Sequence, residues 1–417
     1  MVDPDRVSFG TSDLGRPRLL DLSRLVSRLG QGALTGIDRV ELAYLKALLA
    51  RDAPFHALVR RSGGFCLLDR AGAASIADLA DGRDLPMARD LVARMVWRLA
   101  ALRARAETAA SSVARDRCPR TRILSMLARN LPRGLHYLNV GHSNLDHRVF
   151  AAVRALGGQS MVLVHDVIPL DHPDLTRPDT VAGFDAKLDA AAAGADLVVC
   201  NSHDTAARLV PHLDRRGRLP DLAVAHLGLD PMGPPGTLPS CLDPGRPIFA
   251  ILGTIEPRKN HALLLDVWAD LARNTAPDRL PQLAIIGRRG WNNAAVFARL
   301  DARPVGVVEL GALDDAGRSA VLRYSRALLF PSLAEGYGLP AVEAASIGLP
   351  VLATPLPVFR EILGEYPVYL SGTDVYSWAR AIAALAAEPQ DKGAGRTGQI
   401  RRLPTWADHF NSVLSLI

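Results

Sequence analysis

Short apolar runs alternate with stretches of helical periodicity along most of the chain. An apolar run of four to six residues bounded by turn residues is typical of a buried strand in a parallel sheet, and the helical stretches supply the crossovers. The alternation therefore predicts the α/β fold class. The predicted strands are 19–22, 56–60, 136–139, 161–165, 196–201 and 222–225 in the first half, and 248–253, 282–287, 307–310, 327–331, 350–354 and 368–370 in the second.

A stretch dense in proline and glycine, LGLDPMGPPGTLPSCLDPGRP at 227–247, separates the two series of strands. Proline lacks a backbone donor, so such a stretch continues neither a helix nor a central strand and is typical of a linker. We therefore place a domain boundary near residue 240, with a first domain at 1–240 and a second at 241–403. Residues 404–417 predict one last amphipathic helix, which we expect to cross back to the first domain. A length of 417 residues suits two domains of this size.

The segment 86–133 interrupts the alternation and predicts two long helices without an intervening strand. Between 94 and 133 ten arginines occur with only two acids, Glu107 and Asp116. An apolar stripe at helical spacing accompanies them, made of Leu91, Val92, Met95, Val96, Leu99 and Leu102, with Trp97 beside it. The segment fits a basic surface for an anionic membrane or a lipid phosphate. It fits equally an insertion packed on the first domain with a solvated arginine face.

Composition places the chain among globular proteins, with 48% hydrophobic and 22% charged residues and a net charge of +6. The cysteines, Cys66, Cys118, Cys200 and Cys241, are widely spaced and form no C-x-x-C pair. Neither a zinc site nor a disulfide framework is predicted, which favours a reducing compartment. The first residues lack an apolar signal core, and no run of about 18 apolar residues occurs. We expect a cytoplasmic protein that at most lies on the inner face of the plasma membrane.

The segment 327–354, ALLFPSLAEGYGLPAVEAASIGLPVLAT, carries the strongest chemical signal. A buried strand is predicted to end at Pro331 and a helix to begin at Pro340, because proline is favoured at the first helical position. Gly336 and Gly338 remove side chains where a ligand would approach the backbone. The free N–H groups of the helix start then form an anion site suited to a diphosphate.

Two carboxylates flank this anion site, Glu335 in the loop and Glu343 in the helix. Carboxylates repel phosphate, but they accept hydrogen bonds from hydroxyl groups on either side of it. A hexose at one end and a ribose at the other would satisfy both acids. The arrangement predicts a site for a sugar nucleotide.

The segment EGYGLPAVEA at 335–344 resembles the E-G-[FY]-G-[LI]-P-x-x-E-A motif of the retaining family 4 glycosyltransferases. The resemblance implies the GT-B architecture, in which two Rossmann-like domains face a central cleft. It also implies that Glu335 contacts the donor sugar and Glu343 the ribose. The loop residues expected beside the donor are Gly336, Tyr337, Gly338 and Leu339.

A second match, GTIEPRKN at 253–260, resembles the family's G-x-x-E-P-R-K-[NG] turn. The resemblance implies that Lys259, with Arg258 before it, neutralises the departing diphosphate. Arg258 could instead be held in a structural salt bridge. We expect Thr254 to contact the donor as well, although some relatives carry an arginine at this position.

Weaker signals lie at other strand ends, where open α/β sheets bind their ligands. Gly287 and Arg288 follow one predicted strand and Leu313 follows another; in the family such loops enclose the nucleotide base, but ordinary turns are equally compatible. In the first domain a glycine-containing loop leads to Gly36, where Thr35 and Asp38 predict a helix capping box. This loop could offer amide groups to a phosphate from the opposite wall of the cleft.

The segment MVLVHDVIPLDHP places His165 at a strand end and resembles the H-D-[LV]-I-P stretch of bacterial family members, especially mannosyltransferase-like enzymes of surface polysaccharide assembly. The resemblance implies a histidine near the reacting carbon of the sugar. The alternative is a histidine hydrogen-bonded to backbone at the strand end. A neighbouring strand end, with Asn139 and His142, could line an acceptor pocket.

The predicted reaction moves a hexosyl unit, with GDP-mannose as the preferred donor, to a saccharide or lipid-linked saccharide with retention of configuration. No cofactor or metal is expected, because no D-x-D motif adjoins the phosphate site, and no carboxylate nucleophile is evident on the first-domain face. One alternative is a sugar-nucleotide epimerase of the same fold. Another is an arginine-rich nucleic-acid binder. The nucleic-acid binder is disfavoured because the basic excess is confined to one segment. The chain also lacks a surface that combines aromatic and basic side chains.

Overall fold

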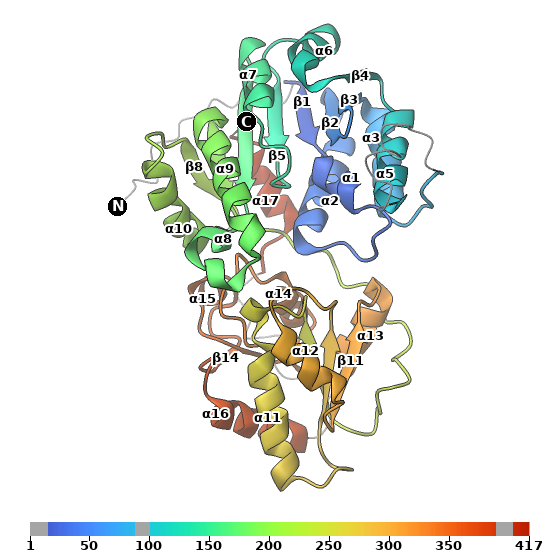
Figure 1. Ribbon diagram of the computed structural model, residues 1–417, viewed down its shortest axis with the longest axis vertical. Coiled ribbons are helices and arrows are strands. Elements are labelled where there is room, and N and C mark those ends of the chain that lie inside the picture. Colours follow the sequence, from blue (N-terminus) through green and yellow to red (C-terminus); the bar gives the residue numbers. More distant parts are fainter. Residues whose placement is uncertain (1–15, 88–100, 389–402, 417) are drawn as a thin grey trace.

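A computed structural model describes residues 16–87, 101–388 and 403–416 and shows two α/β domains, one above the other in Figure 1. The sheet of the first domain has the order β4-β3-β2-β1-β5-β6-β7-β8. Its strands are β1 (Arg18–Asp21), β2 (Phe55–Arg61), β3 (Gly64–Leu68), β4 (Asp116–Cys118), β5 (His136–Asn139), β6 (Gln159–Val164), β7 (Leu197–Cys200) and β8 (Asp221–Val224). The strands from β2 through β1 to β8 are parallel, so their carboxyl ends share one edge.

Helices cover both faces of this sheet because successive strand residues point to opposite faces. Leu20 and Ala57 belong to one apolar cluster, whereas their chain neighbours Leu19 and Leu58 belong to another. The helices on the first face are α1 (Ser23–Arg28), α2 (Gly36–Leu49), α3 (Arg70–Ala80) and α5 (Ala101–Ser112). Those contributing to the second cluster are α6 (Ile123–Asn130), α7 (His147–Ala155), α9 (Pro178–Gly194) and α10 (His203–Asp214), and the short α8 (Ile168–Asp171) precedes α9.

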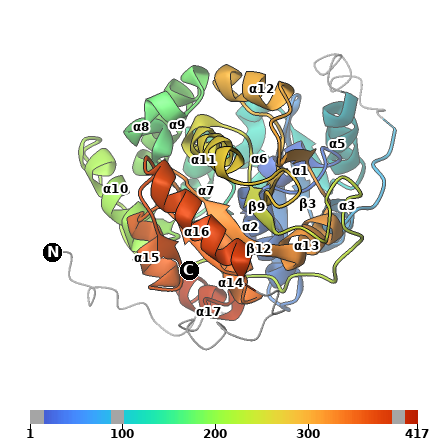
Figure 2. The same ribbon diagram turned by 90° about the horizontal axis from the view of Figure 1, so that it is seen from below.

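The second domain has a smaller parallel sheet with the order β11-β10-β9-β12-β13-β14. Its strands are β9 (Ile248–Leu252), β10 (Gln282–Ile286), β11 (Val307–Gly311), β12 (Ser325–Phe330), β13 (Val351–Ala353) and β14 (Val368–Tyr369). Its helices are α11 (His261–Asn274), α12 (Ala294–Asp301), α13 (Asp315–Tyr324), α14 (Leu339–Ser346), α15 (Pro357–Leu363) and α16 (Val375–Ala387). In the view from below, α11 and α16 lie side by side over this sheet (Figure 2).

The prediction for 86–133 is wrong in one respect, because a strand does interrupt it. β4 pairs antiparallel with β3, and β3 pairs antiparallel with β2, so both extend the edge of the sheet. The segment therefore contributes to the sheet of the first domain and is more than a helical insertion. Most of the apolar stripe predicted here, from Leu91 to Leu99 with Trp97, lies outside the described residues. The strand β3 was not predicted either.

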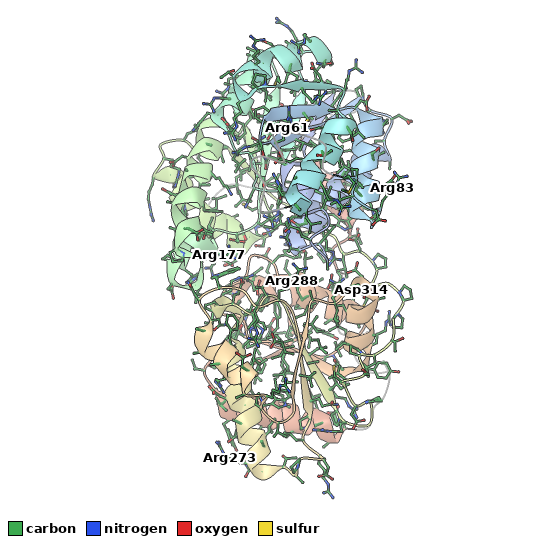
Figure 3. All side chains as sticks on the ribbon, turned by 45° about the vertical axis from the view of Figure 1, so that its right-hand side comes forward. Arg61, Arg83, Arg177, Arg273, Arg288 and Asp314 are labelled. Atoms are coloured by element: carbon green, nitrogen blue, oxygen red, sulfur yellow. The ribbon has the colours of Figure 1, made fainter. Side chains whose placement is uncertain are left out.

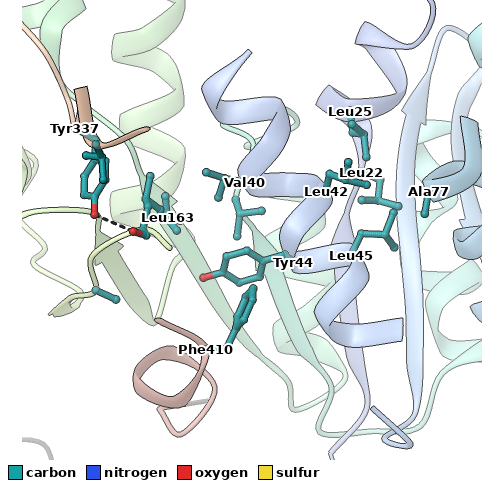
Figure 4. Close-up of a cluster of buried hydrophobic side chains, with 14 of the residues drawn as sticks. Leu22, Leu25, Val40, Leu42, Tyr44, Leu45, Ala77, Leu163, Tyr337 and Phe410 are labelled. Atoms are coloured by element: carbon teal, nitrogen blue, oxygen red, sulfur yellow. Dashed lines mark hydrogen bonds between the residues drawn. The ribbon is translucent and has the colours of Figure 1, made fainter. Parts of the chain in front are cut away.

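The two domains share one continuous apolar cluster. It includes Val40 and Leu45 of α2 in the first domain and Tyr337 and Val342 around α14 in the second. Figure 4 shows Tyr337 at one side of this cluster, where its hydroxyl group donates a hydrogen bond to the Leu227 carbonyl (2.8 Å). The domains therefore meet in part through packed apolar side chains.

The last helix, α17 (Trp406–Val413), lies against the first domain and begins with a capping box formed by Thr405 and Asp408. Phe410 meets the Tyr44 ring edge-on at 5.0 Å (Figure 4), and the Tyr44 hydroxyl lies 2.8 Å from His409 Nε2. These contacts fix the end of the chain to α2. Within the described ranges, no helix combines the length and apolar character needed to cross a lipid bilayer. None of the four cysteines is in a disulfide.

Candidate functional site

The turn after β9 brings two basic side chains to the carboxyl end of the second sheet. Gly253 has a φ of 146°, and a Cβ at this position would lie only 3.0 Å from Lys259 Cε. A 3-10 turn, Pro257–Lys259, follows, and Asn260 then adopts the left-handed conformation that leads into α11. Arg258 and Lys259 are thereby placed side by side at the edge where parallel sheets bind ligands.

Both basic side chains pair with Glu335 of the loop after β12. Lys259 Nζ lies 2.5 Å from Glu335 Oε1, and Arg258 Nη1 lies 2.8 Å from Glu335 Oε2. The Ser332 hydroxyl donates a further hydrogen bond to Oε1 (2.7 Å). The side chains of Lys259 and Glu335 are each only 7% exposed. The sequence motifs 253–260 and 335–344 thus meet in one buried cluster, which we call the Lys259–Glu335 cluster (Arg258, Lys259, Ser332 and Glu335).

The electrostatics of this cluster keep Glu335 ionised. Burial by itself raises the pKa of Glu335, but the positive charges of Arg258 and Lys259 outweigh it and lower this pKa to about 2. Burial lowers the pKa of Lys259, and Glu335 offsets this only in part. A buried lysine whose carboxylate partner can be replaced by a more highly charged anion is well suited to bind a phosphate group.

Arg258 forms the structural salt bridges that its motif left open as an alternative, and its contact with a diphosphate stays a prediction. Its Nε lies 2.5 Å from Glu256 Oε1, and its Nη1 donates a hydrogen bond to the Ala334 carbonyl (3.2 Å). These contacts tie the β9 turn to the loop that carries Glu335. Burial lowers the pKa of Arg258, but Glu335 and Glu256 raise it above its ordinary value, so the guanidinium stays charged.

The glycines of the Glu335 loop are required by packing between protein segments. A Cβ on Gly336 would lie 2.3 Å from the His165 carbonyl oxygen and 2.9 Å from Asp166 Cβ, both in the first domain. Gly338 has a φ of 89° and a Cβ there would lie 2.6 Å from the Phe359 ring. The close neighbour of Gly336 is thus the opposite domain, whereas that of Gly338 is α15 of its own domain. Tyr337 points into the interdomain cluster, and Leu339 packs against the same cluster.

Glu343 lies on α14, is buried, and forms an ion pair with Arg39 from α2 of the first domain. Arg318 Nη2 lies 3.9 Å from the same carboxylate oxygen. The carboxylate is therefore compensated from both domains. Arg39 carries no signal in the sequence, because only the docking of α2 on α14 brings the two residues together.

The glycine-containing loop of the first domain lies across from the second domain. Gly36 is the first residue of α2, next to the capping box of Thr35 and Asp38, and a Cβ on Gly36 would lie 3.3 Å from Leu339 Cδ1. Arg288 donates a hydrogen bond from Nη2 to the Gln31 carbonyl (2.5 Å). Figure 3 shows Arg288 and Arg177 at the level where the domains meet. The loop before α2 thus faces both predicted donor elements, α14 and the turn after β10.

Three of the weaker predicted positions have clear steric surroundings. A Cβ on Gly287 would lie 1.9 Å from the Gly253 carbonyl oxygen, so this glycine permits the β9 and β10 turns to pack. A Cβ on Gly290 would lie 2.7 Å from the methyl group of Thr254, so Thr254 packs against the turn that follows β10. Leu313 is half-buried and packs against the interdomain cluster. The structure thus assigns packing roles to these three residues. Their contact with a donor stays a prediction.

His165 lies at the end of β6 in contact with the Glu335 loop. Its Nε2 donates a hydrogen bond to the Val140 carbonyl (2.7 Å), which is the backbone-bonded geometry of the alternative interpretation. Its backbone carbonyl nevertheless touches Gly336 and accepts a hydrogen bond from Asn201 Nδ2 (2.9 Å). Burial lowers the pKa of His165 to about 4, so the imidazole is neutral at physiological pH. The structure places it beside the Glu335 loop as an uncharged group.

A carboxylate does lie on the first-domain face, contrary to the sequence expectation. Asp166 lies beside Gly336 across the domain boundary and interacts electrostatically with Arg258. Its Oδ1 accepts a hydrogen bond from the Ile168 amide (3.1 Å), and burial raises its pKa. The adjacent His-Asp pair in the sequence could have indicated it, because both residues directly follow β6.

Comparisons with known proteins show what the chain is similar to. The family described as "Glycosyl transferases group 1" matches residues 246–388. The serotype-specific mannosyltransferase WbdA of Escherichia coli is 30% identical over 272 residues, which cover 61% of this chain and 33% of WbdA. The chain thus spans about a third of the length of that relative.

Two solved structures share the two-domain fold over almost their full length. Anabaena Alr3699/HepE in complex with UDP and glucose superposes with a TM-score of 0.61 at 14% identity, covering 96% of this chain and 98% of that one. Sucrose-phosphate synthase from Thermosynechococcus elongatus superposes with a TM-score of 0.59, with the same identity and coverage. At identities this low the comparison bears on the fold alone. The shared fold confirms the predicted α/β GT-B architecture.

Proposed function

Residues 246–388 match the family described as glycosyl transferases group 1, and from this premise we propose that the chain is a retaining hexosyltransferase that uses a nucleoside diphosphate sugar. The preferred donor is GDP-mannose, and the acceptor is a saccharide or lipid-linked saccharide in surface polysaccharide synthesis. The similarity to a serotype-specific mannosyltransferase favours the mannosyl unit. The single observation that carries the proposal is the Lys259–Glu335 cluster at the carboxyl ends of β9 and β12.

In the proposed mechanism the donor diphosphate replaces Glu335 as the partner of Lys259 and Arg258. The two cations then face the oxygen on which negative charge develops as the sugar leaves. Electrostatic groups held in place before the reaction supply a large part of enzymatic rate enhancement. Glu335, ionised because its pKa is about 2, becomes free to accept hydrogen bonds from the sugar hydroxyls.

The reaction breaks the bond between the anomeric carbon and the diphosphate oxygen and forms a bond from that carbon to the acceptor oxygen. Retention requires the acceptor to approach from the face that the diphosphate leaves. The acceptor proton passes to an oxygen of the departing phosphate. Lys259 and Arg258 supply two positive charges at the diphosphate, so the proposed reaction uses no metal and no resident cofactor.

Glu343 is the proposed partner of the donor ribose. Its carboxylate is buried and is paired with Arg39. Ribose hydroxyl groups would compete with Arg39 for the same oxygens. The nucleotide would thus interact with both domains, since Arg39 comes from the first and Glu343 from the second.

The experiment measures transfer with a panel of nucleotide sugars, by release of nucleoside diphosphate and by product analysis. Glu335→Gln and Lys259→Gln should each lower kcat by about 100-fold or more, as expected for loss of one preorganised charge contact. Glu365→Gln, at an exposed position of the same domain, is the matched control. Full activity in the Glu335→Gln variant would refute the proposal, and an altered nucleotide sugar formed without acceptor would indicate the epimerase.

A double displacement through Asp166 is the second candidate mechanism, because its Cβ lies beside Gly336 and its carboxylate interacts electrostatically with Arg258. The same-face mechanism predicts that Asp166→Asn retains measurable transfer and accumulates no glycosyl-enzyme. Complete loss of transfer in this variant, together with a covalent adduct in the wild type detected by mass spectrometry, would favour the double displacement.

A further inference from the structure

A glutamate of the second domain, Glu361, lies at the start of a helix of the first domain. Glu361 belongs to α15, which packs below α10 in Figure 1. The amide of His203 donates a hydrogen bond to Glu361 Oε1 (2.8 Å), and the amide of Asp204 donates one to Oε2 (3.1 Å). These two amides are the first of α10, and the first amides of a helix have no partner within the helix. A carboxylate of the second domain therefore completes a helix of the first.

The same carboxylate pairs with a histidine at the point where the chain leaves the first domain. His226 Nε2 lies 2.7 Å from Glu361 Oε1, and His226 directly precedes the proline-rich linker 227–247. The His226 carbonyl lies 3.0 Å from His409 Nδ1 of α17, the helix that returns to the first domain. Two amides and one imidazole thus converge on one carboxylate. We call this group the Glu361 contact (His203, Asp204, His226 and Glu361).

The Glu361 contact is made by an ionised carboxylate. Burial raises the pKa of Glu361, but the hydrogen bonds from His226 and from the two α10 amides outweigh it and lower this pKa. A negative charge is stabilised at a helix N-terminus by the free N–H groups and the helix dipole. The acid in the first turn of α10, Asp204, pairs instead with Arg208 (3.1 Å). Charge-assisted hydrogen bonds of this kind are stronger than those between neutral groups.

The start of α10 also touches the reaction site. The Thr205 hydroxyl donates a hydrogen bond to the Gly336 carbonyl (3.3 Å). Asn201, just before the helix, donates one to the His165 carbonyl (2.9 Å). A Cβ on Gly336 would lie 2.3 Å from that same His165 carbonyl oxygen, so the two segments are in direct contact. The helix end that binds Glu361 is therefore fixed to both sides of the place where the domains meet.

The helix that carries Glu361 touches the Glu335 loop from the other side. Phe359 of α15 lies 2.6 Å from a Cβ placed on Gly338, and its ring packs on that of Phe330 at the end of β12, with 5.2 Å between the ring centroids. A shift of α15 relative to α10 would press the Phe359 ring against this loop or withdraw it. The Glu361 contact thus joins the two helices that hold the Glu335 loop.

We propose that Glu361 is a positioning residue, which holds the domains in the arrangement where the Glu335 loop meets His165 and Asp166. We call this the docked arrangement. The inference rests on the proposed glycosyl transfer, because the proposed nucleotide site uses both domains. Donor affinity then depends on the fraction of molecules in the docked arrangement. Loss of the Glu361 contact lowers this fraction, and bound donor restores it.

The kinetic test compares Glu361→Gln with Glu365→Gln, in the donor that the wild type uses. Glutamine keeps the size of the side chain and removes its charge, and Glu365 is an exposed acid that pairs with Arg360 of its own domain. Glu361→Gln should raise the donor KM about tenfold or more, since a hydrogen bond to a charged group is worth at least about tenfold. It should leave kcat within about twofold, because saturating donor restores the docked arrangement. Glu365→Gln should change neither.

Small-angle X-ray scattering on the full chain measures the arrangement of the domains without a reaction. Without nucleotide, Glu361→Gln should have a larger radius of gyration than the wild type. Saturating GDP or UDP, whichever binds, should reduce the difference. His226→Ala should change KM and radius in the same direction but by less. Added to Glu361→Gln, it should raise KM by less than the product of the two single effects, because both act through one contact.

The inference is overturned if Glu361→Gln retains the thermal unfolding midpoint, the donor KM and the radius of gyration of the wild type. It is also overturned if kcat falls while KM and radius stay unchanged, because Glu361 would then act in the chemical step. If Glu361→Gln does not fold, His226→Ala decides between the same outcomes. A wild type that transfers no sugar refutes the proposed function, whereas a larger radius of gyration in Glu361→Gln would still support the interdomain role.

Discussion

Gly336→Ala is the substitution that tests how closely the two domains must meet. A Cβ at this position would lie 2.3 Å from the His165 carbonyl oxygen and 2.9 Å from Asp166 Cβ. Both atoms belong to the first domain, and Asn201 fixes the His165 carbonyl with a 2.9 Å hydrogen bond. The φ of Gly336 is not positive, so alanine is not strained by its own backbone. The predicted effect is therefore purely a clash between the domains.

The size of the effect follows from the distance. Carbon and oxygen atoms rarely approach within 3.0 Å, so the Gly336 loop and the His165 backbone must separate by at least about 0.7 Å. Overpacking of this kind costs about 1–3 kcal/mol. The cost arises only when the domains are in contact, so it lowers the population of the closed arrangement by about 5- to 150-fold.

The assay is transfer kinetics together with nucleotide binding. We expect Gly336→Ala to lower kcat/KM by about 5- to 150-fold, and to weaken nucleoside diphosphate binding as well, because the proposed nucleotide site uses both domains. Gly183→Ala is the matched control, because a Cβ on Gly183 in α9 meets no atom within 4 Å. Unchanged transfer in Gly336→Ala would refute the reasoning. So would equal losses in the two variants.

Three further predictions follow from the charges and thiols. Arg39→Ala leaves the buried Glu343 carboxylate without its first-domain partner, so the ligand-free variant should unfold at a lower temperature than the wild type. Nucleotide should then raise the unfolding temperature of the variant by more than that of the wild type, as measured by thermal shift. An equal nucleotide-induced shift in both proteins would contradict this. The pKa of Glu335 lies below its ordinary value, so its ion pairs stabilise the fold above about pH 4.5 and lose this contribution as the pH falls towards 2. The difference in unfolding midpoint between wild type and Glu335→Gln should therefore be largest above pH 5 and shrink below pH 4, and a constant difference would count against the assignment. Of the four cysteines only Cys241 is exposed, and burial raises the pKa of Cys200 to about 12. A disulfide reagent should therefore modify one thiol rapidly in the native protein and all four after unfolding. Rapid modification of several native thiols would disagree with the structure.

The sequence alone determined the features that depend on local pattern. The buried strands β5, β6, β9, β10 and β12 could be predicted because each is a short apolar run ending in turn residues. The capping box of Thr35 and Asp38 and the helix starting near Pro340 follow from the chemistry of helix ends. The motifs around Lys259 and Glu335 indicated the family because their residue types and spacing are specific. By contrast, β4 was missed because an edge strand of three residues, two of them charged, carries no periodic signal. The strand β3 was missed although its five residues are all buried.

Only the tertiary structure decided which residues meet. Lys259 and Glu335 are 76 positions apart in the chain, and Arg39 and Glu343 are 304 apart. No local pattern encodes such pairs, because they form when parallel strands bring their carboxyl ends to one edge and when the domains pack through a shared apolar cluster. The same docking gave Gly336 its steric role and placed Asp166 on the face where no carboxylate was expected. Residue identity fixed the available chemistry, whereas long-range packing fixed the partners of each charge.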